Sequence, residues 1–128
     1  MNVELIVFAI KVKVENPIAE RSFAFALQIV EVYKLLSSER EYVLSKQLVR
    51  SGTSIGANVA EATAAISKRD FAAKMSIASK EARETKYWLM LLEQGELTQI
   101  DLRALLNEVN QLINILTAIV KTAQANME

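Results

Sequence analysis

The sequence predicts an all-α protein, an antiparallel up-down-up-down four-helix bundle with a short extended segment at its N-terminus. Apolar residues make up 52% of the 128 residues, whereas Gly occurs three times and Pro once, so turns must be few and the elements between them long. Four stretches carry apolar residues at alternating steps of three and four, the spacing of one helix face. The length fits one domain, so we assign residues 15–128 to the bundle and residues 1–14 to the extended segment.

The first segment reads differently from the rest of the chain. Residues 3–14 are rich in β-branched side chains, and Val12 and Val14 alternate with Lys11 and Lys13, which is typical of a strand. A lone strand must be covered, so we expect it to pair with a neighbouring subunit or to lie on the bundle. The apolar run lacks a basic leader and is too short to span a bilayer, which predicts a cytoplasmic protein without a membrane partner.

Two helices are predicted after the break at Pro17. The first extends from Ile18 to about Ser38, and the second from about Glu39 to Ile66. The second continues through Gly52 and Gly56, small residues that indicate a close approach of two backbones. The predicted core positions are Phe25, Ile29, Val32 and Leu36, then Leu44, Leu48, Ser51, Ile55, Val59, Ala62 and Ile66.

Capping signals precede the last two helices. Ser67 with Asp70 resembles a capping box, and Gly95 is predicted to end that helix. Thr98 with Asp101 repeats the signal before the fourth helix. The predicted core positions are Phe71, Met75, Ala78, Ala82, Thr85, Leu89 and Leu92, then Leu102, Leu105, Val109, Leu112, Leu116, Ile119 and Ala123.

The fourth helix also carries apolar residues beside its seam. Leu106, Ile113 and Val120 lie seven apart and widen its apolar arc beyond what one bundle seam requires. Trp88 lies one residue off the seam of the third helix. We predict that these four residues form an interface between copies of the chain, and that the protein is a homo-oligomer.

The composition argues against an enzyme, a metal site and a cofactor. The chain has no Cys and no His, which removes thiolate chemistry and the usual general base. Metal sites in bundles draw on Glu-x-x-His pairs, which cannot occur here. Ser45–Lys46 and Ser79–Lys80 are adjacent pairs, and adjacent residues point to different faces of a helix.

Charge is balanced overall, with 15 basic and 15 acidic residues, so nucleic-acid binding would have to be local. Basic residues concentrate in the second and third helices. They form either a solvated face paired with interleaved acids or a patch for RNA, DNA or a protein partner, which oligomerisation would multiply. The candidate binding residues are Lys46, Arg50, Lys68, Arg69, Lys74, Lys80 and Arg83.

A polar cluster is expected where these two helices pair. An antiparallel hairpin that turns near Ile66 brings Arg50 level with about Arg83. The cluster either grips a ligand or fixes the helix register through satisfied polar groups, and we favour the structural interpretation. Its members are Ser54, Asn58, Glu61 and Glu84.

Four stretches of the chain together carry a resemblance to known proteins. They are RSFAFALQIV (21–30), LSKQLVRSGTSIGANVAEA (44–62), SKRDF (67–71) and IASKEARETKYWL (77–89). These stretches resemble the bacterial four-helix-bundle proteins of the 23S ribosomal-RNA intervening-sequence family, and the resemblance covers about residues 15–125.

The resemblance implies an antiparallel bundle that assembles as a ring, commonly a homopentamer, with no known catalytic activity. Relatives include the accessory protein of diversity-generating retroelements, which binds nucleic acid and its reverse transcriptase. Ala62 stands where the family motif has Gly, and this chain is neutral where those relatives are basic. The first functional hypothesis is therefore a ring-forming interaction or scaffold module, and the alternative is a nucleic-acid-binding accessory factor.

Overall fold

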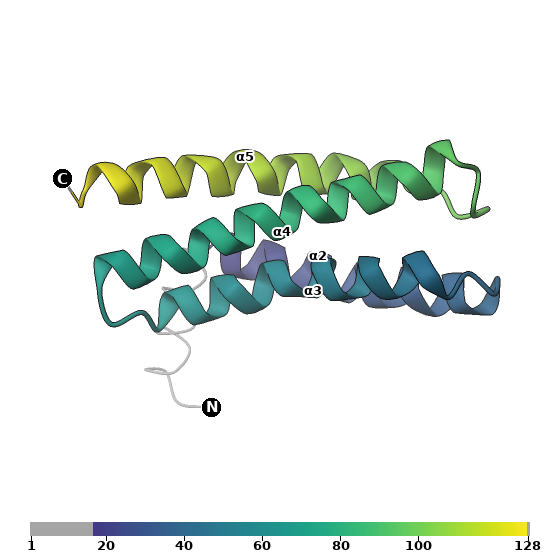
Figure 1. Cartoon of the computed structure of the whole chain (residues 1–128), viewed down its shortest axis with the longest axis horizontal. Helices are drawn as coiled ribbons and strands as arrows, with labels where there is room; N and C mark the ends of the chain where they lie inside the picture. Colours follow the sequence, from purple (N-terminus) through teal and green to yellow (C-terminus); the bar gives the residue numbers. More distant parts are fainter. Residues whose placement is uncertain (1–16, 128) are drawn as a thin grey trace, which may run out of the picture.

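The computed structural model describes residues 17–127, which form four helices. They are α2 (Pro17–Ser38), α3 (Val43–Thr63), α4 (Lys68–Gln94) and α5 (Arg103–Ala125). Each runs antiparallel to the one before it and packs on it, while α2 and α5 touch much less (Figure 1). The described residues confirm the all-α bundle, whereas the predicted extended segment at residues 1–14 lies outside them.

The core lies where the apolar spacing predicts it. Most predicted seam positions are buried, including the polar Ser51 and Thr85. Ile66 is 95% exposed, and Ala72 rather than the neighbouring Phe71 is buried at the start of α4. Ile66 is exposed because α3 ends at Thr63, so Ile66 belongs to a turn and has no helical face to share. The other predicted seam positions that are only half-buried are Leu44, Ile119 and Ala123.

The two glycines of α3 allow α2 to approach closely, as predicted. A Cβ atom on Gly52 would lie 2.8 Å from Cγ2 of Ile29, closer than such atoms can pack. A Cβ atom on Gly56 would lie 3.3 Å from the carbonyl oxygen of Ser22. Both positions therefore exclude any larger side chain unless α2 moves.

The predicted start of α3 near Glu39 is wrong, because the helix begins at Val43. Arg40 interrupts the helical backbone with a φ of 65°, in the left-handed region that non-glycine residues rarely adopt. Glu41 then accepts hydrogen bonds from the amides of Val43 and Leu44 at 3.2 and 3.0 Å. Its carboxylate therefore satisfies the free amides of the first helical turn.

Ser67 caps α4 as predicted, with its hydroxyl oxygen accepting a 3.0 Å hydrogen bond from the amide of Asp70. Gly95 does follow the helix, but its φ is −80°, and the left-handed residue is Glu96 with a φ of 54°. Gly95 is required for space, because a Cβ atom there would lie 2.7 Å from the carbonyl oxygen of Leu91.

Thr98 does not cap α5, contrary to prediction. Its hydroxyl donates a 2.6 Å hydrogen bond to Glu39, and α5 begins only at Arg103. Asp101 instead accepts a 3.1 Å hydrogen bond from the amide of Arg103. Among the described helices, none combines the length and the hydropathy needed to cross a membrane.

Candidate functional site

Two buried hydroxyl groups set the register of α3 against α4. The Oγ1 atom of Thr85 lies 2.9 Å from Oγ of Ser51 and 2.8 Å from the carbonyl oxygen of Glu81. Both side chains are fully buried. Ser51 of α3 is thus level with Thr85 of α4. The sequence predicted Arg50 level with about Arg83, so the observed pairing of the two helices differs from the predicted one by less than one helical turn.

The polar cluster lies on the surface over this contact. The guanidinium of Arg50 forms an ion pair with Glu84 and contacts Glu81 at 3.4 Å. Glu84 also accepts a 3.0 Å hydrogen bond from the indole N–H of Trp88. The carboxylate of Glu84 therefore links the guanidinium of Arg50 on α3 to the indole of Trp88 on α4.

The remaining cluster residues are also satisfied by the protein. Ser54 donates to the carbonyl oxygen of Arg50, and Asn58 donates to that of Ser54, both at 2.8 Å within α3. Glu61 forms an ion pair with Lys74 at 3.3 Å. In the described part of the chain, no buried side-chain nitrogen or oxygen lacks a partner. This geometry supports the structural interpretation.

The structure divides the predicted basic patch. Arg50 and Lys74 are engaged by carboxylates, and Arg83 reaches α5, where it donates a 3.1 Å hydrogen bond to Oγ1 of Thr117. The other four are exposed, and no carboxylate within residues 17–127 lies in ion-pair distance of them. They are Lys46, Lys68, Arg69 and Lys80.

A hollow between α4 and α5, here called the α4–α5 groove, gathers cations that the sequence analysis did not combine. Its volume is about 630 Å³. Arg83, Lys86 and Lys121 line it, and none of the acidic residues between 17 and 127 does. The other polar lining residues are Asn110, Asn114 and Thr117. Such a surface offers cations and neutral hydrogen-bond donors to an anion.

The sequence held a signal for this groove. Asn110, Asn114, Thr117 and Lys121 lie at helical spacings of four, three and four, so they share one face of α5. A polar stripe beside the apolar seam, rather than a count of charges in one hairpin, would have revealed it. Lys121 lies on the fourth helix, outside the second and third helices where the basic residues concentrate.

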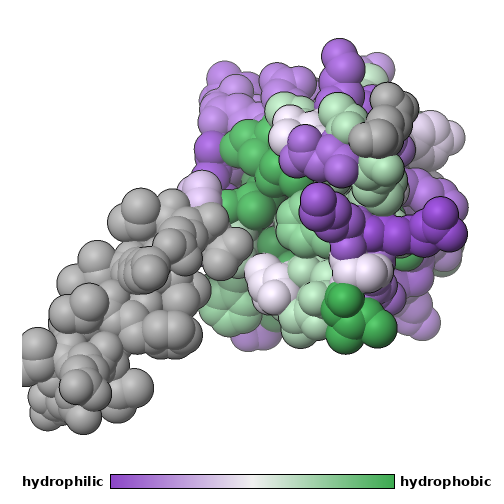
Figure 2. All heavy atoms as spheres, turned by 90° about the vertical axis from the view of Figure 1, so that its left-hand side faces the viewer, coloured by the Kyte–Doolittle hydropathy of each residue, from purple (hydrophilic) through white to green (hydrophobic). Residues whose placement is uncertain are grey.

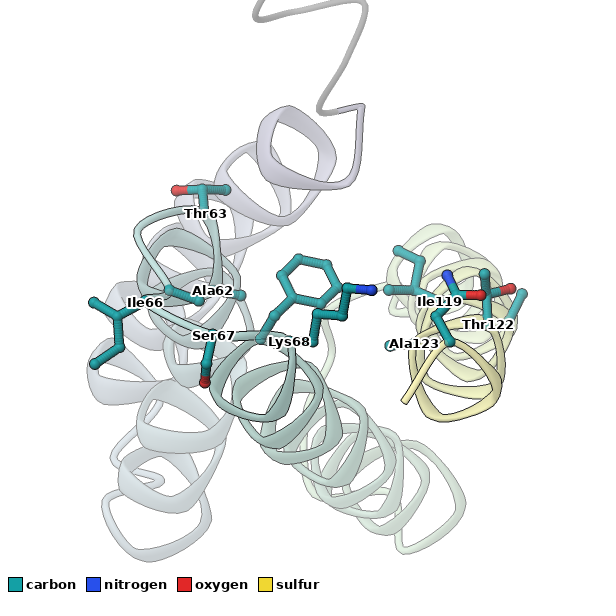
Figure 3. Close-up of a pocket in the computed structure, with 12 residues that line it drawn as sticks. Ala62, Thr63, Ile66, Ser67, Lys68, Ile119, Thr122 and Ala123 are labelled. Carbon is teal, nitrogen blue, oxygen red and sulfur yellow. The ribbon is translucent and has the colours of Figure 1, made fainter. Parts of the chain in front are cut away.

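A second hollow, here called the end groove, lies between the α3–α4 turn and the last turns of α5 (Figure 3). Its volume is about 820 Å³. Ile119 and Lys68 point into the gap from its two sides, whereas Ile66 points away from it. Figure 2 looks onto this end of the bundle and shows apolar surface bounded by polar side chains.

The predicted interface residues lie largely within the subunit. Ile113 is only 8% exposed, and Trp88, Leu106 and Val120 are half-buried against the core. The wide apolar arc of α5 is thus partly used by its own bundle. Large exposed apolar side chains occur elsewhere, on the outer faces of α2 and α4.

The adjacent Ser45 and Lys46 of α3 differ in exposure. Ser45 is buried while Lys46 is exposed, so this pair cannot act together. Among residues 17–127, no three Asp, Glu, His or Cys side chains gather closely enough to hold a metal ion.

Comparison with known proteins identifies the family. The model of the 23S rRNA-intervening sequence protein family matches residues 15–118. A crystal structure of a protein with unknown function from the S23 ribosomal protein family of Bacteroides thetaiotaomicron is 44% identical, with a TM-score of 0.78. The match covers 83% of this chain and 96% of that chain. No curated protein shows significant similarity. The chain therefore belongs to the 23S rRNA-intervening sequence protein family.

Proposed function

We propose that the protein is a non-enzymatic, ring-forming homo-oligomer that acts as an interaction or scaffold module in the bacterial cytoplasm. The observation that carries this proposal is an apolar stripe on the outer face of α2. Phe23 and Leu27 are 65% and 55% exposed, and the half-buried Val30 continues the stripe at the spacing of one helix face. Large apolar side chains that gather outside a core mark surfaces for association.

A ring requires two different surfaces on each subunit, because a head-to-tail contact joins one patch to another. The outer face of α4 supplies a second one, with Tyr87 and Leu91 exposed. Since α2 packs on α3 and α3 on α4, the two stripes lie on different sides of the bundle. Full burial of a Phe or Leu side chain stabilises association by about 1.5–3 kcal/mol. The family resemblance implies five subunits.

Light scattering behind size exclusion tests this proposal. The wild-type mass should be a multiple of 14.3 kDa. Phe23→Glu and Leu27→Glu should yield the monomer while the helical circular dichroism is retained, because both side chains lie outside the core. Gln28→Glu is the matched control on the same helix and should assemble normally. A monomeric wild type, or assembly that tolerates both variants, would overturn the proposal.

The α4–α5 groove favours a second candidate function, a nucleic-acid-binding accessory factor. Phosphate oxygens are held by Arg and Lys together with neutral donors, and Arg83, Lys86, Lys121, Asn110 and Asn114 offer that mixture without an opposing carboxylate. Each subunit offers few contacts, so useful affinity would require several subunits acting together.

Salt dependence of RNA or DNA binding tests this second function. Lys86→Glu and Lys121→Glu should weaken binding at low salt and reduce the salt slope by about 0.7–0.9 for each lost phosphate contact. Lys34→Glu, on α2 and distant from the groove, is the control. Changing Lys46, Lys68 and Arg69 to Glu tests the patch predicted from the sequence. Absence of binding at low salt would eliminate this function.

A further inference from the structure

Within residues 17–127, α2 does not cover the last turns of α5. The guanidinium of Arg21, near the start of α2, forms an ion pair with Glu108 and donates a 2.7 Å hydrogen bond to Gln111 of α5. Because antiparallel helices rise equally, Pro17, four residues before Arg21, is level with about Ile115, four residues beyond Gln111. The stretch of α5 beyond that level has no α2 beside it, and Figure 1 shows α5 extending past the start of α2.

The end groove occupies this open edge. Its α5 side is formed by Ala118, Ile119, Thr122 and Ala123, and its other side by the end of α3 and the start of α4, including Phe71. Ile119 and Phe71 are only half-buried although they pack on the core. Lys68 is the one charged residue among those that line it. An apolar hollow of about 820 Å³ is large enough to enclose several side chains.

The chain that precedes α2 begins beside this groove. The carbonyl of Ser22 lies against Gly56, so Pro17 is level with about Glu61, one residue from the groove residue Ala62. Sixteen residues precede Pro17, and residues 10–15 alternate between apolar and charged: Ile10, Val12 and Val14 against Lys11, Lys13 and Glu15. In an extended conformation such a segment presents one apolar face and one charged face.

We propose that residues 10–16 of the chain bind in the end groove of their own subunit, in an extended conformation, with Val12 and Val14 facing the groove and Lys11 and Lys13 facing solvent. On α5 the residues that line the groove run from Ala118 to Asn126, which is about 12 Å at 1.5 Å per residue. Four extended residues span about the same distance, at 3.3 Å each. The segment thus takes the place that a longer α2 would fill.

The absence of Cys from the sequence permits a direct test by disulfide formation in the full chain. The test variant carries Val14→Cys with Thr122→Cys. The control carries Lys13→Cys with Thr122→Cys. Its first cysteine is only one residue further from Pro17 than that of the test variant, but it lies on the opposite face of an extended segment. Thr122 is exposed, so the substitutions should not disturb the core, and circular dichroism checks this.

Upon oxidation with glutathione disulfide, the Val14 variant should close within one chain about ten times faster than the Lys13 variant, because docking raises the local concentration of one face only. Equal rates would show a tethered chain that does not dock, and would overturn the proposal. Disulfide-linked dimers from the Val14 variant would show that a second copy supplies the segment, and would equally overturn binding within one subunit. Neither result bears on the α2 stripe.

Discussion

Removing the two buried hydroxyl groups of Ser51 and Thr85 one at a time should lower the free energy of unfolding by different amounts. Thr85 can donate its single proton to one acceptor only, and the carbonyl of Glu81 at 2.8 Å is the nearer one. Ser51 then donates to Thr85, since its alternative acceptor, the carbonyl of Leu48, lies at 3.4 Å. Removing the Thr85 hydroxyl therefore leaves Ser51 with only a long, weak hydrogen bond, whereas removing the Ser51 hydroxyl leaves Thr85 bonded to Glu81.

The magnitudes follow from this asymmetry. Thr85→Val should lower the free energy of unfolding by about 1–2 kcal/mol, because a buried donor loses its good acceptor. Ser51→Ala should cost about 0.5–1 kcal/mol, because only one net hydrogen bond is lost and Ala favours the helix. The double variant leaves no orphaned group, so its cost should fall below the sum of the single costs by about 1 kcal/mol.

Urea denaturation of the four proteins, followed by circular dichroism, measures these differences. The slope of unfolding free energy against urea should be the same in all four, so that midpoints report stability directly. Additive costs within about 0.3–0.5 kcal/mol would contradict the proposed coupling. A larger cost for Ser51→Ala than for Thr85→Val would contradict the assigned direction of the hydrogen bond.

Three further predictions concern single positions. Gly52→Ala should destabilise the protein by about 1 kcal/mol in urea denaturation, because crowding against Ile29 (about 1–3 kcal/mol) outweighs the helix propensity gained; greater stability would contradict the close approach. Ser67→Ala should cost about 1 kcal/mol in the same assay because α4 loses its cap, and an unchanged midpoint would argue against that hydrogen bond. Hydrogen bonds from the side chain and then the amide of Arg103 lower the pKa of Asp101 to about 2. This folded pKa is below the unfolded value of about 3.9, so the hydrogen bonds to Asp101 stabilise the fold fully above a pH of about 3.9. The stabilisation is lost as the pH falls through about 2. An NMR titration of the Asp101 carboxyl should show the low pKa, and Arg103→Ala should raise it.

The core could be predicted from the sequence because burial in a bundle follows local spacing. Ala78, Ala82, Thr85 and Leu89 of α4 lie at steps of four, three and four, and all four are fully buried. Short connections between helices also determined the antiparallel order, and the Ser67 cap was visible as a local motif. These features depend on residues close together in the chain.

The turns were less predictable, because they depend on backbone conformations that the residue types disfavour. Arg40 and Glu96 both adopt positive φ angles, although neither is Gly, and Arg40 lies in the turn that moves the start of α3 from about Glu39 to Val43. Gly95 was predicted to end α4 and does follow it, but the backbone becomes left-handed only one residue later, at Glu96.

The candidate sites were only partly predictable because they lie between helices whose relative rotation the sequence does not specify. Arg83 was assigned to the α3–α4 surface, yet its guanidinium reaches Thr117 and lines the groove with Lys121. Ile113 was expected to contact a second subunit, yet most of its surface is buried within its own bundle. Whether Leu106 and Val120 contact another copy stays a prediction.

The order in which the helices pack has a consequence for folding. Among the four described helices, each large contact joins helices that are consecutive in the chain, and the limited contact of α2 with α5 alone joins distant ones. Chains dominated by such local contacts close short loops, and helical bundles of this kind fold in microseconds to milliseconds. The terminal helices α2 and α5 can each detach while the α3–α4 hairpin persists, so hydrogen exchange should be slowest in the middle of that hairpin.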